Sequence, residues 1–497
     1  MEERLPISEK KIISQHIFMF PFRLKTEYVL ENLKRKVIKD GWEYKIFDFK
    51  FGDVDAAAKY NEYTYFHEYV RRAIFNEGES NSDYISLYFE RAIPNNATFD
   101  LYIKGEKTYT LTISHISLRL FDTNVGILTI ELLNDDCPSS EDVLIINDFG
   151  RRIYPQFIGE EQGTEETKDV FLADKIVLHF DEKEIEEDFK KENFLKMEVK
   201  VANYIEYLLG ETLKTEIIPI IDDRMFTLCW YENDELSKSL CSKKGNEYEY
   251  ESSDFWYMFI YVDGRKGGGI ANTEMQKELI KTTTYSRWAD YGTLYGISRY
   301  SFVCITNRGD FGYNTIRNHM QRIYYQMAVI FLAQRASILR FSNDVSKITS
   351  KTKVTEDIVE QVKDLYFSFI RFTNRLSFTE ISPQEQGIEM YNMAVKNIGL
   401  REQLNELRYQ IERLYEFVDM LHEKTISKGL RLIRVISFLF IAPTLAATLI
   451  NMGVFSENIK ILIFGCNIQN GLLFIILAFL ISTILWLFYK IGLRGRR

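Results

Sequence analysis

The chain has few prolines and few cysteines for its length. Only 8 of its 497 residues are proline, so most of the chain can form regular helices and strands. The five cysteines lie far apart and include no CxxC pair, which argues against a disulfide framework and against a zinc site. The first residues carry charges where a secretory signal needs an apolar core. We therefore expect a reducing compartment and no signal peptide.

The sequence also lacks the motifs of catalytic sites. No GxSxG, Walker A or GxGxxG pattern occurs, and the six histidines are scattered without the spacing of metal ligands. We therefore expect a protein that is not an enzyme, with no catalytic residues, no bound metal and no resident cofactor.

Positive charge is concentrated at the end of the chain. The net charge is −9, but the segment from Thr425 onwards holds eight basic residues and one acidic residue, which leaves −16 for the preceding part. An acidic body with a basic tail is not the charge distribution of a nucleic-acid-binding protein, because such proteins need positive charge to meet the phosphates. We expect no direct contact with nucleic acid.

Two long uncharged runs stand near the end of the chain, at residues 435–455 and 471–489. Each is close to the roughly 20 residues that a helix needs to cross a bilayer. Basic residues flank the pair on both outer sides, and the connection 456–470 holds one lysine and one glutamate. The positive-inside rule then predicts a multi-pass protein of the inner (cell) membrane, with both termini cytoplasmic and a short external loop.

A long helical stretch precedes the first span. Pro383 marks its predicted start, and we expect one rod from Gln384 to Ala442. Its apolar residues alternate in steps of four and three, as in a coiled-coil seam, at Leu400, Leu404, Leu407, Ile411, Leu414, Val418 and Leu421. This pattern favours a stalk shared between subunits; an ordinary antiparallel core helix is the alternative. The segments Thr315–Ser346 and Thr355–Ser377 are predicted to form a helical hairpin beside it.

The first 314 residues alternate strand-like and helical runs, which predicts an α+β domain with a mixed sheet and helices on at least one face. The run FWYMFIYV is among the predicted strands, and Ala56–Phe75 and Lys183–Leu209 are predicted helices. The resulting division of the chain is a ligand-sensing domain (1–314), a helical hairpin (315–383), a stalk helix (384–434), a first span (435–455), an external loop (456–470), a second span (471–489) and a basic cytoplasmic tail (490–497).

Three polar clusters in this domain are candidates for ligand binding. Two adjacent arginines follow the apolar run VLII, and arginine forks suit a phosphate diester. Acidic residues follow the run EIIPII, where they could accept ribose hydroxyls or an amino group. A glycine-rich turn, DGRKGGG, would let backbone amides approach a phosphate. Surface ion pairs and a flexible loop are the alternatives. The candidates are Arg151, Arg152, Asp222, Asp223, Arg224, Arg265 and Lys266.

The plan of the chain resembles the CorA superfamily of magnesium channels. Pro443 and Phe455 stand at about the separation that the family has between its pore-helix proline and the aromatic residue after its Gly-Met-Asn signature. Here Asn451-Met452-Gly453-Val454 takes the place of that signature. The resemblance implies a funnel-shaped homo-oligomer, a pentamer, with Mg²⁺ as a candidate permeant ion. The expected pore-lining residues are Thr448, Asn451, Met452 and Glu457.

Within that superfamily, a large cytoplasmic domain and an altered signature resemble the CorA-like membrane effectors of type III CRISPR systems. The resemblance implies a channel in the lipid bilayer, gated by a small nucleotide messenger, adenylated S-adenosylmethionine (SAM-AMP), that disrupts ion balance in antiviral defence. The alternatives are a constitutive divalent-cation (Mg²⁺) transporter and a membrane-anchored binding module without a pore.

Overall fold

The computed structural model describes most of the chain before residue 452 and short pieces after it. The described residues are 11–48, 55–75, 84–103, 105–155, 172–189, 201–264, 270–351, 355–451, 462–463, 466–467, 479–480 and 482–484. They fall into two compact units, of which the first comprises Met1–Thr352 with Asp364–Ile411 and the second Lys353–Lys363 with Glu412–Arg497.

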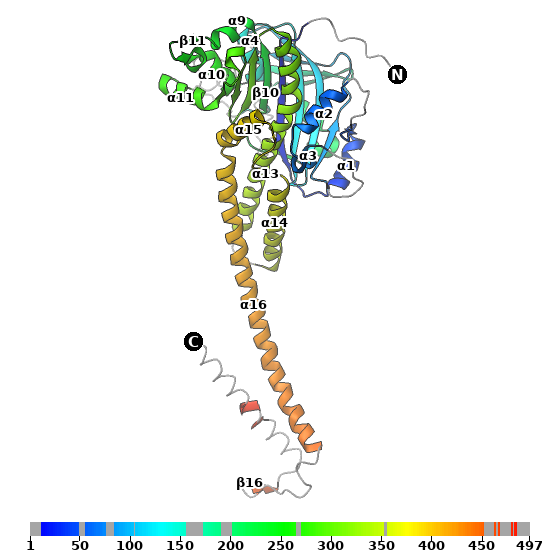
Figure 1. The fold of residues 1–497 in the computed structure, drawn as a ribbon. Coiled ribbons are helices and arrows are strands. Elements are labelled where there is room, and N and C mark those ends of the chain that lie inside the picture. Colours follow the sequence, from blue (N-terminus) through cyan, green and yellow to red (C-terminus); the bar gives the residue numbers. More distant parts are fainter. Residues whose placement is uncertain are drawn as a thin grey trace, which may run out of the picture. The chain divides into compact units, whose positions relative to one another are not determined.

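One large sheet organises the first unit (Figure 1), and it is antiparallel except for the pair β10 (Phe226–Glu232) and β15 (Ser301–Thr306). Two further strands attach to the long central strands: β3 (Ser86–Glu90) pairs with β5 (Tyr109–Phe121), and β9 (Ile217–Pro219) pairs with β1 (Ser14–Leu24). The main path runs through β13 (Thr284–Tyr285), β14 (Leu294–Ile297), β15 (Ser301–Thr306), β10 (Phe226–Glu232), β1 (Ser14–Leu24), β6 (Val125–Asn134), β5 (Tyr109–Phe121), β4 (Thr98–Tyr102), β7 (Lys175–Phe180) and β8 (Lys183–Glu187).

The hydrophobic core lies against one face of this sheet. Successive strand residues point to opposite faces, so Phe18, Phe20 and Phe22 of β1 share a side, and all three are buried in the core. Apolar residues of three helices complete this core: α1 (Leu30–Lys39), α4 (Ser140–Gly150) and α7 (Asn203–Leu209). The sequence prediction of an α+β domain with a mixed sheet is confirmed.

The opposite face of the central strands is covered by other helices. The long helix α13 (Tyr325–Thr349) packs on β1 and β6. Near its N-terminal end lie α2 (Ala56–Thr64) and α3 (Glu68–Ile74). The predicted helical hairpin 315–383 thus begins with a helix that packs on the sheet, and α13 belongs to the first compact unit.

Two local predictions in the N-terminal part were wrong. The run FWYMFIYV forms helix α10 (Asp254–Tyr261) and not a strand. The side chain of Ser253 caps its first turn by accepting a hydrogen bond from Trp256 N, and the helix packs on β14 and β15. The predicted helix Lys183–Leu209 begins instead with β8. Asp181 and Glu182 both adopt positive φ, and this turn folds β8 back onto β7 as a hairpin.

The predicted rod from Gln384 to Ala442 is divided into two helices. Helix α15 (Glu385–Ile398) ends at Gly399, whose φ of +74° is the left-handed conformation that terminates helices. Helix α16 then runs without interruption from Leu400 to Asn451. In the first unit the seam residues Leu407 and Ile411 are buried by the chain's own residues.

Helix α14 (Glu356–Arg375) and α16 each contribute residues to both units. In the second unit Ile358, Val362 and the seam residue Val418 are buried within the single chain. Further along α16 the large apolar side chains are exposed, among them Leu432, Ile433, Phe440 and Ile441. No helix within the described residues has the length and apolar character to cross a membrane. Most of the predicted loop and of the second span lies outside the described residues.

Candidate functional site

Two of the three predicted polar clusters meet in the structure. Arg151 and Arg152 follow helix α4, and Asp222, Asp223 and Arg224 lie in the segment before β10. Backbone hydrogen bonds hold the segments together, from Met225 N to the carbonyl oxygen of Arg151 (2.8 Å) and from Ile153 N to that of Asp223 (3.2 Å). The third cluster touches them, since Gly264 N donates to Asp148 Oδ2 at 3.1 Å.

The charged groups of these clusters are paired with one another. Arg151 and Arg152 are almost fully buried and both contact Asp148, with N–O distances of 3.4 and 3.2 Å. Arg152 also reaches Asp223 at 3.5 Å, and Arg224 lies 2.8 Å from Asp222. These contacts place the arginines in a buried ion-pair network, and their predicted role in ligand binding stays a prediction.

The other predicted site residues are described only in part. Arg265, Lys266, Met452 and Glu457 lie outside the described residues. Asn451 is the last residue of α16, and Thr448 is exposed with its hydroxyl donating to the carbonyl oxygen of Thr444 at 2.7 Å. The role of these residues in a pore stays a prediction.

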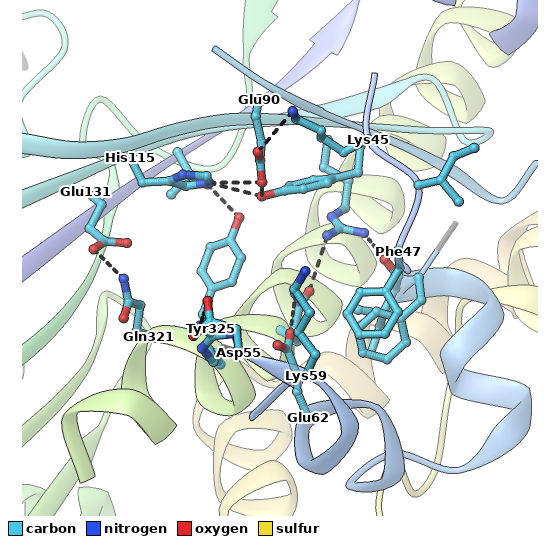
Figure 2. Close-up of a pocket in the computed structure, with 18 of the residues that line it drawn as sticks. Lys45, Phe47, Asp55, Lys59, Glu62, Glu90, His115, Glu131, Gln321 and Tyr325 are labelled. Atoms are coloured by element: carbon cyan, nitrogen blue, oxygen red, sulfur yellow. Dashed lines mark hydrogen bonds and ion pairs between the residues drawn. The ribbon is translucent and has the colours of Figure 1, made fainter. Parts of the chain in front are cut away.

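A pocket of about 580 Å³ lies elsewhere, between the sheet and the helices that cover its second face. This volume is in the range of sites for small molecules and nucleotides. Figure 2 shows Glu90, His115 and Glu131 along the sheet side, and Asp55, Lys59 and Glu62 along the helix side opposite. All lining residues belong to the first compact unit.

The polar floor of the pocket follows from strand alternation. On β5, His115, Ser117 and Arg119 alternate with buried apolar residues, and Thr129 and Glu131 do the same on β6. The register aligns these residues across strands, with Ser117 beside Thr129 and His115 beside Glu131. The sheet therefore presents apolar residues to the core and polar residues to the pocket.

An irregularity in β5 adds a residue to this floor. The register with β6 shifts between Ile113 and His115, so Ser114 is an extra residue, as in a β-bulge. Both Ser114 and His115 line the pocket. Ser114 Oγ donates to Glu131 Oε1 at 2.8 Å, so the bulge places a hydroxyl on the carboxylate of the next strand.

Glu131 is held by neutral donors. Its Oε1 atom also accepts hydrogen bonds from Gln15 Nε2 (2.6 Å) and Gln321 Nε2 (2.8 Å, Figure 2). The side chain is 4% exposed and forms no ion pair among the described residues. A buried carboxylate with only neutral partners is costly, because hydrogen bonds from amides do not replace an opposite charge.

Glu62 of α2 is a second carboxylate of this kind. It is buried and accepts a hydrogen bond from Gln326 Nε2 of α13 at 2.9 Å. Burial raises the pKa of Glu62, and the hydrogen bond from Gln326 opposes that shift only in part. A cation brought into the pocket would stabilise the ionised form.

Arg119 of β5 is the principal buried cation of the pocket. One Nη donates to the carbonyl oxygen of Ile74, and the other to Gln326 Oε1 at 3.3 Å. Its Nε has no hydrogen-bond partner, and its guanidinium lies 4.6 Å from the ring centre of Tyr88. Burial lowers the pKa of Arg119, and no carboxylate of the described residues forms an ion pair with it.

Lys59 is a second cation without a carboxylate partner in the described part of the chain; its Nζ donates only to the carbonyl oxygen of Asp48, at 3.4 Å. Other charged groups in the pocket are already paired. Arg322 contacts Asp55 at 3.3 Å, and Lys45 lies 3.9 Å from Glu90. The pocket therefore offers two cations and two carboxylates that form no ion pair within the part of the chain that the structure describes, although Arg119 and Lys59 are near enough to Glu62 to favour its ionised form.

This arrangement suits a ligand that carries both signs of charge. Arg119 and Lys59 can meet a phosphate, and Glu62 and Glu131 can meet an ammonium or another cation. Phe47, Phe75 and Tyr88 add aromatic surface on which a base could stack. Within the described residues, no group of three His, Cys, Asp or Glu side chains could hold a metal ion.

Sequence reasoning missed this pocket. None of the predicted ligand-binding residues lines it. A signal was present, because three strands that the structure places side by side carry polar side chains on the face that lines the pocket: Tyr88 and Glu90, His115 and Arg119, and Glu131. Comparison with protein-family models, with curated proteins and with solved structures found no match for this chain.

Proposed function

We propose that the chain is a messenger-gated membrane channel of the CorA-like type, an antiviral effector in which the pocket between the sheet and α13 binds SAM-AMP. The observation that carries this proposal is the set of pocket charges, Arg119, Lys59, Glu62 and Glu131, that form no ion pair within the described residues. SAM-AMP joins a phosphate, an adenine base and the cationic amino-acid part of S-adenosylmethionine. Arg119 and Lys59 would meet the phosphate, and Glu62 and Glu131 the cationic part.

The pocket also contacts the helix from which a signal could spread. Tyr325 and Gln326 stand at the start of α13 and line the pocket. Further along the same helix, Gln334 Nε2 lies 3.0 Å from the hydroxyl of Tyr391 in α15, and Phe341 packs on Phe369 in α14. A ligand that binds one position of α13 more tightly than another would shift the population of helix positions.

The C-terminal part supplies the proposed channel. Arg431 and Arg434 precede an apolar stretch of α16. Among its described side chains, Ile436, Phe440 and Ile441 are exposed in the single chain, Phe440 by 71%. Exposed apolar surface of this extent needs a membrane or a partner subunit. In the proposal, this apolar stretch of α16 crosses the inner membrane. Five copies of the chain assemble as a homopentamer, with Thr448 and Asn451 facing the pore.

Two measurements test the proposal at separate steps. Titration calorimetry with SAM-AMP, AMP and S-adenosylmethionine should show tight binding only of the joined molecule, because AMP lacks the cationic amino-acid part and S-adenosylmethionine lacks the phosphate. Liposomes that contain the purified chain should release ions only after that ligand is added. Mg²⁺ flux without any nucleotide would instead support a constitutive transporter, and binding without flux would support an anchored module without a pore.

A further inference from the structure

The turn between β14 and β15 contacts three helices of the first compact unit. It is closed by a hydrogen bond from Ser298 N to the carbonyl oxygen of Ser301 at 2.9 Å. Ser298 Oγ also donates to the carbonyl oxygen of Ile260 in α10 at 2.9 Å. The other two helices that the turn contacts are α13 and α15. A displacement of one of these helices can therefore reach another through the turn.

Helix α13 holds the turn through Arg335. This side chain is 9% exposed, and its Nη1 donates to the backbone carbonyl oxygen of Arg299 at 3.1 Å. Tyr325 and Gln326, which line the large pocket of about 580 Å³, stand at the start of the same helix, roughly 15 Å away along its axis. An uninterrupted, buried helix moves as one body, so a shift of α13 at the pocket is expected to move the turn as well.

The turn in its own right holds the end of α15. Arg299 Nη2 donates to the carbonyl oxygen of Ile398, the last residue of that helix, at 3.2 Å. The same oxygen accepts a hydrogen bond from Gln403 Nε2 of α16 at 2.9 Å. Carbonyl groups at the end of a helix lack partners within it and carry partial negative charge, so a guanidinium is a favourable partner. One oxygen thus joins the turn to both helices that meet at Gly399.

The rest of α15 is fixed by separate contacts. Asn397 Nδ2 donates to the carbonyl oxygen of Ile297 in β14 at 2.8 Å. Earlier in the helix, Glu389 forms an ion pair with Arg287 at 2.7 Å. A movement of Arg299 is therefore expected to act on the junction at Gly399 more than on α15 as a whole.

We propose that the β14–β15 turn couples α13 to the first turns of α16, with Arg335 and Arg299 as the positioning residues that carry the coupling to Gly399. The inference rests on the proposed function, because a ligand in the large pocket is the event that shifts α13. Neither arginine lines that pocket. Since their two contacts stand in series, loss of either breaks the connection, and loss of both should have no larger effect than loss of one.

Hydrogen exchange of the full chain tests the coupling without any ligand. Arg299→Met and Arg335→Met should each raise the exchange rate of the amides of residues 400–411 roughly 2- to 10-fold, which is the effect of one lost hydrogen bond. The double variant should exchange no faster than the faster single variant. Unchanged exchange in Arg335→Met, or effects that multiply in the double variant, would overturn the proposal.

Arg340→Met is the matched control on α13. Arg340 is also buried, but it pairs with Glu27 and Asp344 and not with the turn. Exchange of residues 400–411 in this variant should equal that of wild type. An increase as large as that of Arg335→Met would mean that any loosening of α13 has the same effect, and it would overturn the assignment of the coupling to the turn.

SAM-AMP provides the second test. Arg299→Met should bind SAM-AMP at least as tightly as wild type does, because binding no longer has to move α16. At saturating SAM-AMP it should release ions from liposomes at least about 5-fold more slowly. A variant that is merely less well folded would bind more weakly. Arg287→Met, which loses a contact with α15 far from Gly399, should release ions as wild type does.

The outcomes separate this inference from the proposed function. Normal ion release by Arg299→Met would overturn the coupling while the proposed function stands. If wild type does not bind SAM-AMP, the proposed function fails, and the exchange rates of the ligand-free variants still decide whether the turn couples α13 to α16.

Discussion

Gln326 of α13 donates a hydrogen bond of 2.9 Å to Glu62 of α2, a residue 264 positions earlier in the chain. The same glutamine accepts a hydrogen bond from Arg119 of β5 at 3.3 Å. One amide thus links the covering helix, the long helix and the sheet at a wall of the large pocket. The amide lies between two opposite charges that favour each other's ionised forms without a direct ion pair, so each group keeps a hydrogen-bonding position that a charged ligand can use.

Replacing Arg119 tests the pocket directly. Arg119→Met should weaken binding of SAM-AMP by at least about 30-fold, since loss of a buried charge partner costs about 2 kcal/mol or more. Calorimetry on the folded variant measures the change. Arg91→Met is the matched control, because Arg91 is partly buried beside Trp42 and does not line the pocket. Unchanged affinity in Arg119→Met would move the site elsewhere.

Glu62 should make the stability of the protein depend on pH. Burial raises the pKa of Glu62 above its ordinary 4.5, so the folded state favours the protonated form, and this contribution to stability is lost as pH rises through the folded pKa. Glu62→Gln removes the contribution. The stability of this variant relative to wild type should therefore be greater at pH 8 than at pH 4. Urea unfolding at pH 4 and pH 8 measures the difference in the free energy of unfolding between the variant and wild type. The same difference at both pH values would contradict the prediction.

His16 should act with the opposite sign. It is fully buried, and burial lowers its pKa to about 4, against a hydrogen bond between its Nδ1 and Asn147 Oδ1 at 2.7 Å. In the unfolded state His16 is protonated at a higher pH than in the folded state. The free energy of unfolding therefore falls by about 3 kcal/mol as the pH drops from 6.5 to 4. Urea unfolding between pH 6.5 and pH 4 should show this decrease in the free energy of unfolding for wild type and a smaller decrease for His16→Gln. His179→Gln, at a partly exposed histidine, should keep it.

Gly399 should be required for the junction between α15 and α16. Alanine at its φ of +74° costs about 1 kcal/mol, and asparagine tolerates the left-handed conformation better. Stability should therefore decrease in the order glycine, asparagine, alanine. Differential scanning calorimetry gives the order. A more stable Gly399→Ala variant would mean that a single continuous helix is preferred.

The membrane proposal rests on the apolar stretch of α16. An arginine at the centre of a spanning helix costs about 2.5–3.5 kcal/mol on insertion scales. Phe440→Arg should therefore reduce the fraction of protein that stays with membranes after alkaline carbonate extraction. Phe417→Arg, at another exposed position of α16 before the predicted span, should leave it unchanged. Equal extraction of the two variants would argue against insertion of this segment.

The sequence predicted the strands with alternating apolar residues well, because β1, β5 and β6 each bury one face in the core. It failed where local composition misled. Apolar aromatic residues in α10 have strand propensity, and packing on β14 and β15 decides for the helix. The charged residues after Asp181 have helix propensity, but pairing with β7 makes them a strand. Tertiary contacts override propensity in both cases.

The candidate site was less predictable than the fold. The sequence singled out Arg151 and Asp222 as candidate ligand-binding groups at the ends of apolar runs, and the structure places them near each other. The burial of Arg151 could not be foreseen, because its side chain contacts the carbonyl oxygen of Val262, which comes from distant sequence. The large pocket depends on which strands become neighbours and which helices cover them, and alternation alone does not contain that information.

The spacing of apolar residues along β5 has a consequence for how this protein could change. Tyr109, Leu111 and Ile113 face the core before Ser114, and Ile116, Leu118 and Leu120 face it afterwards. Removing Ser114 would leave an unbroken period-two strand with the same core residues. The extra residue therefore does not change which residues of β5 pack in the core, and it affects only the face of the sheet that lines the pocket. A lineage could gain or lose it in one step, altering what the pocket accepts while the scaffold stays the same.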